Sequence, residues 1–447
     1  MRAPVYVALL LLAVARPAPA QERTAPPAPR GTSPDSLVAQ ALAVSPRIHA
    51  VRARLDAARA RVAPAGARPD PVLMAGLQNV PVSSPSLSAD EMTMKMVGVS
   101  QTLPYPGKLG LARSVAAHEA EAAEIEVEAA QLDVRREVLD AWYELAFLDR
   151  ALEIVERNRA TLVSLIAAAE VRYGTGTGSQ QDVLTARVEA SRLGEEAAGL
   201  QERRRAAQAR INAALNRPSD APVGDARIPE RIVRAAVADS AAGIRFVSPA
   251  LGSRAAGSPL PPLEEVQAAA VANNSSLRSH EAMIAVQAAR LERARRAHLP
   301  DFDLSLQYGQ RDGRRDMVSA TVSVPLPVQR GRRQDAGVAE AQASLAALHA
   351  EHEAEASALH AEVARLYGAL EQSRTQAALY VRAILPQGQA ALASAAAAFQ
   401  AGRTDLRTVL GAQATLFQYE TAYHRALADF GQRLAELDRV VGREVLP

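Results

Sequence analysis

Three methionines alternate along one short segment of the chain and offer ligands for a soft metal ion. Met92, Met94 and Met96 lie two residues apart, the spacing that places side chains on one face of a β-strand. Thioether sulfur is a ligand that Cu(I) prefers, so Met94 and Met96 are candidate metal ligands. The competing and favoured interpretation is that these methionines only fill space in the wall of a sheet.

A second set of candidate ligands lies in the C-terminal half of the chain. His349, His352, Glu353 and His360 follow one another at a spacing that suits one face of a helix, and imidazole and carboxylate groups bind zinc. Glu351 continues the polar stripe around them, which favours a solvated helix face. We therefore predict no resident metal ion and no cofactor.

The other chemistry-bearing residues do not form a catalytic motif. The sequence has no Gly-x-Ser-x-Gly nucleophile elbow, no phosphate-binding glycine loop and no His-Glu-x-x-His pair. Its 51 basic and 49 acidic residues nearly balance, which argues against a nucleic-acid partner. The absence of cysteine excludes disulfides and lipid attachment through cysteine. We predict that the protein is not an enzyme.

A short motif recurs in the two halves of the chain. Tyr173-x-x-Gly176 returns 226 positions later as Phe399-x-x-Gly402, and the Val-Leu pair that follows each glycine returns with it. Glycine at such a place suits the reversal of the backbone between two helices. The repeat is far longer than the roughly 20–50 residues of solenoid repeats, so one long structural unit is duplicated in tandem.

The elements that carry these residues are mainly helices. Aromatic residues make up only 4% of the chain, and its windows rich in Ala, Glu, Leu, Gln and Arg are typical of long helices. The run 108–172 contains no proline and predicts one helix of about 65 residues, roughly 100 Å long. Its counterpart spans about 332–400 and is interrupted by Pro386. Shorter helices are predicted at 36–61, 180–215, 263–298 and 405–441.

Four segments bounded by proline, glycine or serine predict β-strands. They span about 72–80, 92–103, 302–310 and 317–326. Each strand pair precedes a long helix, so both pairs lie at one end of the molecule and both glycine turns at the other. We expect helices 180–215 and 263–298 to stack end to end along the first long helix, and helix 36–61 to pack along the second.

The first twenty residues predict a cleaved secretory signal. Arg2 precedes an apolar stretch too short to span a bilayer, and Ala18 and Ala20 give small residues before a cleavage site. The predicted organisation is a signal peptide at 1–20, a proline-rich linker at 21–34, a first repeat at 35–216, an insert at 217–262 and a second repeat at 263–447.

The strand count predicts an oligomer if the mature chain crosses a membrane. No later apolar run reaches the roughly 18 residues of a transmembrane helix. A membrane-spanning backbone that is not helical has to form a closed barrel. Natural barrels have at least about eight strands, so four strands are too few and several copies would have to combine theirs.

In the order of its elements the chain resembles the TolC-like outer-membrane efflux channels, in particular their heavy-metal branch. The resemblance spans essentially the whole mature chain. It rests on the duplicated order, on the two glycine-turn motifs and on segment 101–109, Gln-Thr-Leu-Pro-Tyr-Pro-Gly-Lys-Leu. It implies a fold that is mainly α with a small β part, in which duplicated long-helix hairpins of a homotrimer form an α-barrel across the periplasm. Twelve strands, four from each chain, would form a β-barrel in the outer membrane of a Gram-negative bacterium, and the insert would form an equatorial belt.

The resemblance also implies partners and site residues. A trimer in outer-membrane lipid would open at its periplasmic tip when a periplasmic adaptor protein and an inner-membrane efflux pump engage it. The implied tip residues are Tyr173, Gly176, Asp182, Phe399, Gly402, Arg403 and Asp405. The implied strand–helix junction residues are Pro104, Pro106, Gly107 and Pro327.

The polar tip residues leave alternatives open. Asp182 either faces the lumen as part of the gate or caps the returning helix. The second copy has Thr408 and Gly411 where acids are common in the family, and Asp405, one turn away, is the candidate substitute. Arg403 is the predicted polar lock of the second turn.

We expect a passive exit duct for metal cations or small toxic solutes, driven by the inner-membrane pump. The same architecture also suits the outer-membrane duct of a type I protein secretion system. A periplasmic coiled-coil scaffold that forms no channel would explain the helices but not the two strand pairs.

Overall fold

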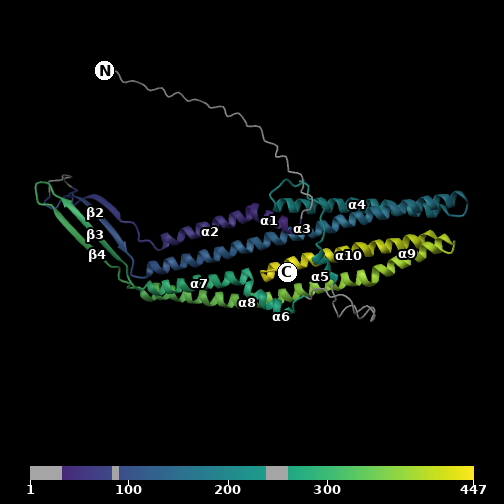
Figure 1. Ribbon diagram of the computed structural model, residues 1–447. Helices are drawn as coiled ribbons and strands as arrows, with labels where there is room; N and C mark the ends of the chain where they lie inside the picture. The colour runs from purple at the N-terminus through teal and green to yellow at the C-terminus, as the bar shows by residue number, and fades with distance from the viewer. Residues whose placement is uncertain (1–32, 83–89, 238–259, 447) are drawn as a thin grey trace, which may run out of the picture.

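The computed structural model describes residues 33–82, 90–237 and 260–446 (Figure 1). The predicted signal peptide, nearly all of the predicted linker and the centre of the predicted insert lie outside these ranges. The described chain is a long rod of helices with one β-sheet at its end, and the C-terminus lies near the middle of the rod (Figure 1).

The two halves of the chain fold into the same succession of elements. The first half contains α1 (Pro34–Val44), α2 (Pro46–Ala65), β1 (Val72–Gln78), β2 (Met94–Leu103), α3 (Lys108–Gly174) and α4 (Gln180–Ala214). The second half contains α6 (Leu263–Asn273), α7 (Ser275–Arg296), β3 (Phe302–Gln310), β4 (Met317–Ser323), α8 (Arg330–Leu379), η3 (Tyr380–Ile384), α9 (Leu385–Gln400) and α10 (Leu406–Val441). The short helix α5 (Glu230–Val237) lies in the connection between them.

Three strands are shorter than the sequence predicted. β1 ends at Gln78 because Asn79 takes a left-handed conformation, with φ of 56°. β2 begins at Met94, since the N–H of Met92 is donated to the Asp90 side chain at 2.7 Å and belongs to the preceding turn. β4 ends at Ser323, before the proline-containing junction to α8.

Two helices that the sequence predicted as continuous are each broken, at equivalent positions. Ser45 separates α1 from α2, and Asn274 separates α6 from α7, 229 positions later. Pro46 has no N–H with which to continue the first helix. The Asn274 side chain accepts from the Leu277 N–H at 3.0 Å and donates to the Val440 carbonyl at 2.8 Å. It therefore caps α7 and ties it to α10.

The second long helix passes Pro386 without ending. α8 runs into one wide turn of π-helix, η3, and continues as α9, which has Pro386 in its first turn. Proline cannot donate a hydrogen bond, and its ring crowds the carbonyl four residues earlier, so one wider turn accommodates it. Arg382 of this turn donates to the Val237 carbonyl at 3.0 Å. The predicted interruption is thus a local widening, anchored to the end of α5.

Each half of the rod pairs two shorter helices with one long helix. α2 follows the sheet-proximal part of α3 and α4 follows its distal part, whereas α7 and α10 lie along α8 and α9 in the same way (Figure 1). α7 also packs against α3 and joins the two halves. The prediction that helix 36–61 packs along the second long helix was wrong. The antiparallel strands β1 and β2 reverse the direction of the chain between α2 and α3. The helix α3 therefore runs back alongside α2.

Ion pairs fasten α3 to the helices around it. Arginines of α4, α7 and α10 donate to carboxylates of α3 at 2.6 to 2.7 Å: Arg204 to Asp149, Arg290 to Glu119 and Arg439 to Asp133. Partly exposed pairs of this kind each contribute only about 0–1 kcal/mol. Their consequence is specificity, because opposite charges on facing helices select one register.

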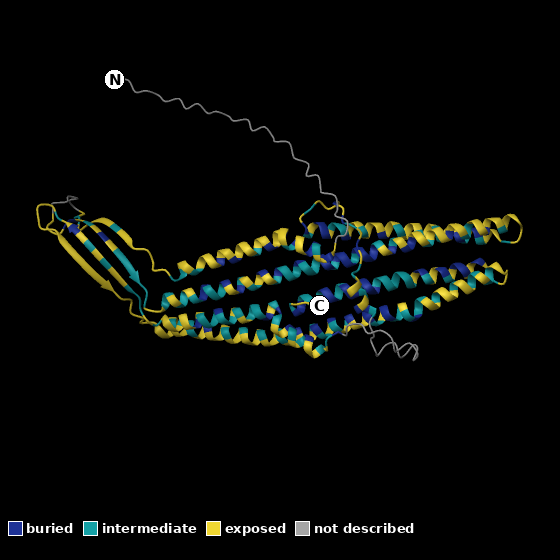
Figure 2. Ribbon diagram, viewed as in Figure 1, coloured by how far each residue is buried: buried dark blue, intermediate teal, exposed yellow. Residues whose placement is uncertain are grey.

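The largest core lies at mid-length, where α3, α8 and α10 meet the connecting segment (Figure 2). Trp142 of α3 is 1% exposed and donates its indole N–H to the Arg227 carbonyl at 3.1 Å. Tyr367, its equivalent in α8 225 positions later, donates its hydroxyl to the Pro261 carbonyl at 3.1 Å. The two aromatic side chains therefore anchor the two ends of the connecting segment in the same way.

The four strands form one antiparallel sheet in the order β1-β2-β3-β4. Met96 of β2 lies opposite Gly76 on one side and Gly309 on the other, and Gly309 lies opposite Met317. Among the described strands, β1 and β4 have one partner each, so both edges of the sheet are unpaired. Such edges expose backbone donors and acceptors that can pair with a further strand.

The two faces of the sheet differ in chemistry. One face, here called the apolar face, carries Leu73, Val97, Val99, Leu306, Tyr308, Val318 and Val322, all largely exposed. The opposite face, here called the methionine face, carries Met94, Met96, Ser100, Ser305, Gln307, Ser319 and Thr321. Within residues 33–82, 90–237 and 260–446, no helix combines the length and hydropathy that crossing a membrane requires.

Candidate gate at the paired helix turns

The first turn, at the end of α3, is closed by a glycine-dependent hydrogen-bond pattern. The Gly176 N–H donates to the Tyr173 carbonyl at 3.0 Å, and the Thr177 N–H donates to the Arg172 carbonyl at 2.9 Å. These two bonds form a Schellman motif, which requires a left-handed residue after the helix. Gly176 supplies it with φ of 69°. The spacing Tyr-x-x-Gly is therefore the signature of this helix end.

The start of α4 is closed by a reciprocal capping box. The Asp182 N–H donates to the Ser179 hydroxyl at 3.2 Å, and the Ser179 N–H donates to the Asp182 carboxylate at 3.4 Å. Two backbone donors at the helix start are thereby satisfied. The carboxylate also lies at the positive end of the helix dipole. These two hydrogen bonds support the interpretation of Asp182 as a helix cap. A role of Asp182 in gating stays a prediction.

The second turn repeats the first in its backbone. The Gly402 N–H donates to the Phe399 carbonyl at 3.0 Å, and the Arg403 N–H donates to the Ala398 carbonyl at 2.9 Å. Gly402 has the same φ of 69° as its equivalent in the first turn. The two turns are therefore the same Schellman motif built twice.

The side chains that cap the two returning helices have exchanged places. Asp405, the equivalent of Ser179, accepts from the Thr408 N–H at 3.0 Å and from its hydroxyl at 2.6 Å. Thr408 is in turn the equivalent of Asp182. The hydrogen bonds from Thr408 hold the pKa of Asp405 below its ordinary value. Each turn therefore keeps one carboxylate and one hydroxyl, at opposite ends of the same four-residue step.

A contact between an arginine and an aromatic ring joins the two turns. The guanidinium carbon of Arg172 lies 4.6 Å from the ring centroid of Phe399, a cation–π arrangement. The groove between the turns has a volume of about 520 Å³, and Asp182, Arg403 and Asp405 line it. Arg403 as a polar lock stays a prediction, and the observed bridge is Arg172. The sequence analysis did not single out Arg172. A signal was present in the sequence, because the equivalent position in the second copy is Ala398 and the two copies therefore differ there.

An apolar seam packs the two repeats together beside this contact. Its buried members come from α3, α4 and α10: Leu162, Ala169, Val183, Ala186, Leu406 and Leu410. Phe399 packs against the same cluster. It therefore belongs both to the seam and to the cation–π contact.

The repeated Val-Leu pairs are covered unequally. Val183 and Val409 are both buried, but Leu184 is 53% exposed, whereas its equivalent Leu410 is 6% exposed. Leu410 is covered by the first repeat. None of the 16 residues of α9, all of which the structure describes, is buried, although the helix is rich in alanine. One flank of the tip is therefore apolar and uncovered in the single chain.

At the other end of the rod, Asp301 fixes the first strand–helix junction. Its Oδ1 atom accepts from the Tyr105 N–H and from Lys108 Nζ, both at 2.8 Å. Burial by itself would raise the pKa of Asp301, but these hydrogen bonds and the Lys108 charge outweigh burial and lower it. Gly107 is the N-cap of α3, with φ of 91°, and a Cβ on it would overlap the Arg296 guanidinium.

The predicted junction prolines lie in two different environments. Pro104 is half-buried, and the carbonyl of Pro106 accepts from the Arg296 guanidinium at 3.0 Å. Pro327 is exposed, and α8 begins at Arg330 without a side-chain cap. Residues of the second repeat thus hold the first junction, whereas the second junction projects into solvent.

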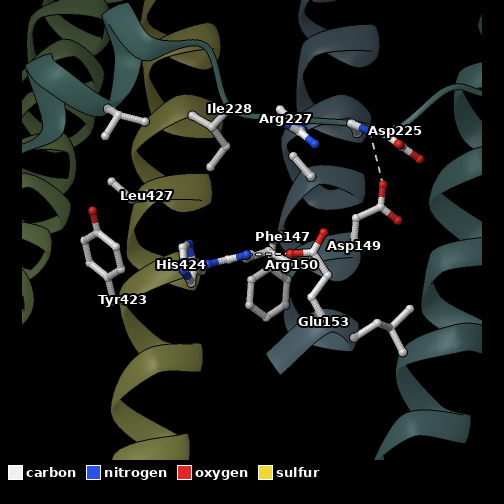
Figure 3. A pocket seen from close by; sticks show the side chains of 14 residues that line it. Phe147, Asp149, Arg150, Glu153, Asp225, Arg227, Ile228, Tyr423, His424 and Leu427 are labelled. Carbon is white, nitrogen blue, oxygen red and sulfur yellow. Dashed lines mark hydrogen bonds and ion pairs between the residues drawn. The ribbon is translucent and has the colours of Figure 1, made fainter. Parts of the chain in front are cut away.

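A pocket of about 600 Å³ opens at mid-length between α3, the connecting segment and α10 (Figure 3). His424 Nε2 accepts from Arg150 Nε at 3.3 Å. Burial, together with the positive charges of Arg150 and Arg157, lowers the pKa of His424 to about 4. Arg150 also pairs with Glu153. The arginine therefore joins α3 to α10 through a histidine that is neutral at physiological pH.

The candidate metal ligands of the sequence lie in separate places. Across the part of the chain that the structure describes, no three His, Asp or Glu side chains converge as they would around a metal ion. His349, His352 and His360 lie on α8. Met94 and Met96 lie on the methionine face of the sheet, where Met94 is only 9% exposed.

The chain thus combines duplicated helix hairpins with glycine turns at one end and an open-edged sheet with two unlike faces at the other. The chain belongs to the outer membrane efflux protein family, whose model matches residues 37–217 and 267–443. No curated protein sequence matches the chain.

Solved structures of outer-membrane channels share the fold. The chain is similar to the outer-membrane channel OprN, with a TM-score of 0.74 at 19% identity over 93% of this chain and 91% of that one. It is similar to the outer membrane protein VceC from Vibrio cholerae, with a TM-score of 0.73 at 20% identity over 92% and 96%. For CusC, which forms a transmembrane channel, the TM-score is 0.73 at 16% identity over 92% of each chain.

Proposed function

We propose that the protein is the outer-membrane channel of a tripartite efflux system. It is a passive exit duct for small toxic solutes, metal cations among them, that an inner-membrane pump delivers through a periplasmic adaptor protein. The observation that carries the proposal is the sheet, with two unpaired edges and two faces of opposite chemistry at one end of the rod. Membership of the efflux protein family supports it.

The open sheet needs other copies of the chain to close. In a barrel, β4 of one copy pairs with β1 of the next, which removes both unpaired edges. Four strands are below the minimum of about eight, and three copies give twelve. The apolar face then meets lipid and the methionine face lines the lumen.

The uncovered flank of the tip supports the same assembly. Within one chain, Leu410 of the second repeat packs in the seam with Ala169 of the first. Their equivalents are Leu184 of the first repeat and Ala395 of the second, and Leu184 is 53% exposed. If the repeats alternate around a ring, Leu184 of one copy meets Ala395 of the next. The exposed flank is then a second copy of the seam, formed between chains.

The paired turns serve as the gate of this duct at its periplasmic end. The two turns are held together by the seam and by the Arg172–Phe399 contact, and the groove between them is open to solvent. An adaptor protein that binds there would separate the turns, and solute would enter the tunnel. In the proposed trimer, the described parts of the connecting segment, 217–237 and 260–262, lie at mid-length of the rod and contribute to a belt. Trp142 holds them at the Arg227 carbonyl and Tyr367 at the Pro261 carbonyl.

Fractionation and reconstitution test the proposal. The protein should be extracted from outer membranes only with detergent, migrate as a trimer and give stepwise conductance in planar bilayers. A strain that lacks it should lose tolerance of toxic cations or small organic toxins. Recovery of the protein from the soluble periplasm without detergent would overturn the channel. Normal tolerance combined with loss of an exported protein would favour secretion as the function.

Cross-linking tests the arrangement of the copies. The chain has no cysteine, so Leu184→Cys combined with Ala395→Cys introduces the only two thiols. A bifunctional thiol reagent should convert the double variant into covalent dimers and trimers. Leu184→Cys alone is the matched control and should stay monomeric on a denaturing gel. Intramolecular linkage without oligomers in the double variant would contradict the ring.

A further inference from the structure

The register of the sheet places three methionines next to one glycine on the methionine face. Gly309 of β3 lies opposite Met96 of β2 and opposite Met317 of β4. Neighbouring strands are about 4.8 Å apart, so the two methionines flank Gly309 on either side. Met94 lies two residues before Met96 on the same face, and its side chain reaches over Gly309. A Cβ on Gly309 would lie 2.5 Å from the Met94 sulfur.

The glycine is what makes the convergence possible. Any side chain at 309 would occupy the space in which the Met94 sulfur lies, whereas a Cβ on Gly76, on the other side of Met96, would meet nothing within 4 Å. Met94 is 9% exposed, whereas Val97 on the opposite face of the same strand is 53% exposed. The Met94 thioether is therefore held in place by its surroundings.

The chemistry of this cluster is selective. Thioether sulfur is a soft, uncharged ligand that favours Cu(I) over the hard divalent cations. Filling a core gap needs only one flexible side chain, and methionine does this in many proteins. Here three methionines from two strands occupy register positions next to one glycine, and that glycine leaves room for the side chain of Met94, which exceeds what gap-filling requires.

We propose that Met94, Met96 and Met317 form a binding site for a soft monovalent cation, Cu(I) or Ag(I), over Gly309. The site follows from the register and side-chain packing of the sheet within one chain. Only its access to exported solute, through the lumen of the barrel, rests on the proposed function. The absence of a charged ligand makes the binding reversible, which suits a site that a cation visits on the way out.

Silver titration of the purified protein in detergent tests the site. With methyl-¹³C methionine and a chloride-free buffer, Ag(I) should shift the methyl resonances of Met94, Met96 and Met317 together, at one equivalent per chain. Met283 on α7 is 39% exposed and serves as an internal control that should not move. Equal shifts of all methionine resonances, or none at one equivalent, would overturn the site.

Two glycine variants separate the site from the mere presence of methionine. Gly309→Ala displaces the Met94 sulfur while keeping every methionine, and Gly76→Ala is the matched control on the same face. Losing even an outer partner of a metal site costs roughly 10- to 100-fold in affinity, so Gly309→Ala should weaken Ag(I) binding at least about tenfold. Gly76→Ala should bind as the unaltered protein does. Equal affinity of both variants would refute the proposal.

A methionine variant covers the case in which Gly309→Ala fails to fold. Met94→Leu conserves side-chain volume and removes one sulfur. It should weaken Ag(I) binding by a similar factor, and unchanged affinity would refute the site. Because the readout is binding, a failure leaves the duct assignment standing. A failure of bilayer conductance leaves the site standing in the same way.

Discussion

The contact between the two helix turns gives a measurable prediction for gating. Arg172→Gln removes the positive charge, and Phe399→Leu removes the ring while leaving an apolar side chain in the seam. Each change should favour the open tip, because the guanidinium and the ring bridge the two turns at 4.6 Å and part when the turns separate.

The size of the effect follows from the geometry and from the proposed trimer. A cation–π contact at an exposed site contributes about 0.5–1 kcal/mol. Three such contacts that open together give about 1.5–3 kcal/mol, a shift of roughly 10- to 150-fold in the closed–open equilibrium. The double variant should shift the equilibrium no further than either single variant, since both changes remove the same contact.

Single-channel recording in planar bilayers gives the open fraction of each variant. Arg187→Gln is the matched control, because Arg187 lies near the same tip but donates to Glu170 at 2.7 Å within the first repeat. It should leave the open fraction nearly unchanged. Additive effects of Arg172→Gln and Phe399→Leu would refute the reasoning. An effect of Arg187→Gln as large as that of Arg172→Gln would do the same.

Three further changes test the fold itself. Gly402→Ala should lower the free energy of unfolding by about 1–2 kcal/mol, because φ of 69° strains any L-residue. Gly174→Ala, within the helix, is the control and should be neutral or stabilising. Thermal unfolding in detergent compares the two variants. Gly431→Ala should cost about 1–3 kcal/mol in the same assay, since its Cβ would lie 2.8 Å from the Tyr143 ring, and a neutral result would contradict the packing. Folding lowers the pKa of His424 from 6.5 to about 4. Between these two pH values only the unfolded chain binds a proton on His424, so the folded protein should lose stability as the pH falls from 6.5 towards 4. The loss should approach about 3 kcal/mol per chain, and His424→Gln should remove this part of the pH dependence.

The parts of the fold that sequence could predict have a residue-type signature. Gly176 and Gly402 mark the helix turns because only glycine takes the left-handed position of a Schellman motif without strain. The run 108–172 predicts the single helix α3, because it contains no proline that would interrupt the backbone hydrogen bonds. The strand pairs follow from their proline and glycine boundaries.

The parts that sequence missed depend on contacts between distant segments. Asn274 breaks its helix where its side chain reaches the Val440 carbonyl, 166 residues away. The wide turn before Pro386 is anchored by Arg382 on the end of α5. Arg172 gains its role only from the ring of Phe399 in the other repeat. Each partner lies outside the window that local patterns cover.

The exchanged caps also shape the electric field along the axis of the gate. The carboxylate stands at the third helical position in the first turn, as Asp182, but just before the helix in the second, as Asp405. The Asp182 side chain reaches back to the Ser179 N–H, whereas the Asp405 side chain reaches forward to the Thr408 N–H, so the two carboxylates lie at similar levels beside the start of their helices. In the proposed trimer, six carboxylates would then form one ring, and a departing cation would meet the negative potential in a single step. Each of these charges also closes a helix end, so the ring could not be neutralised without loosening the turns that carry it.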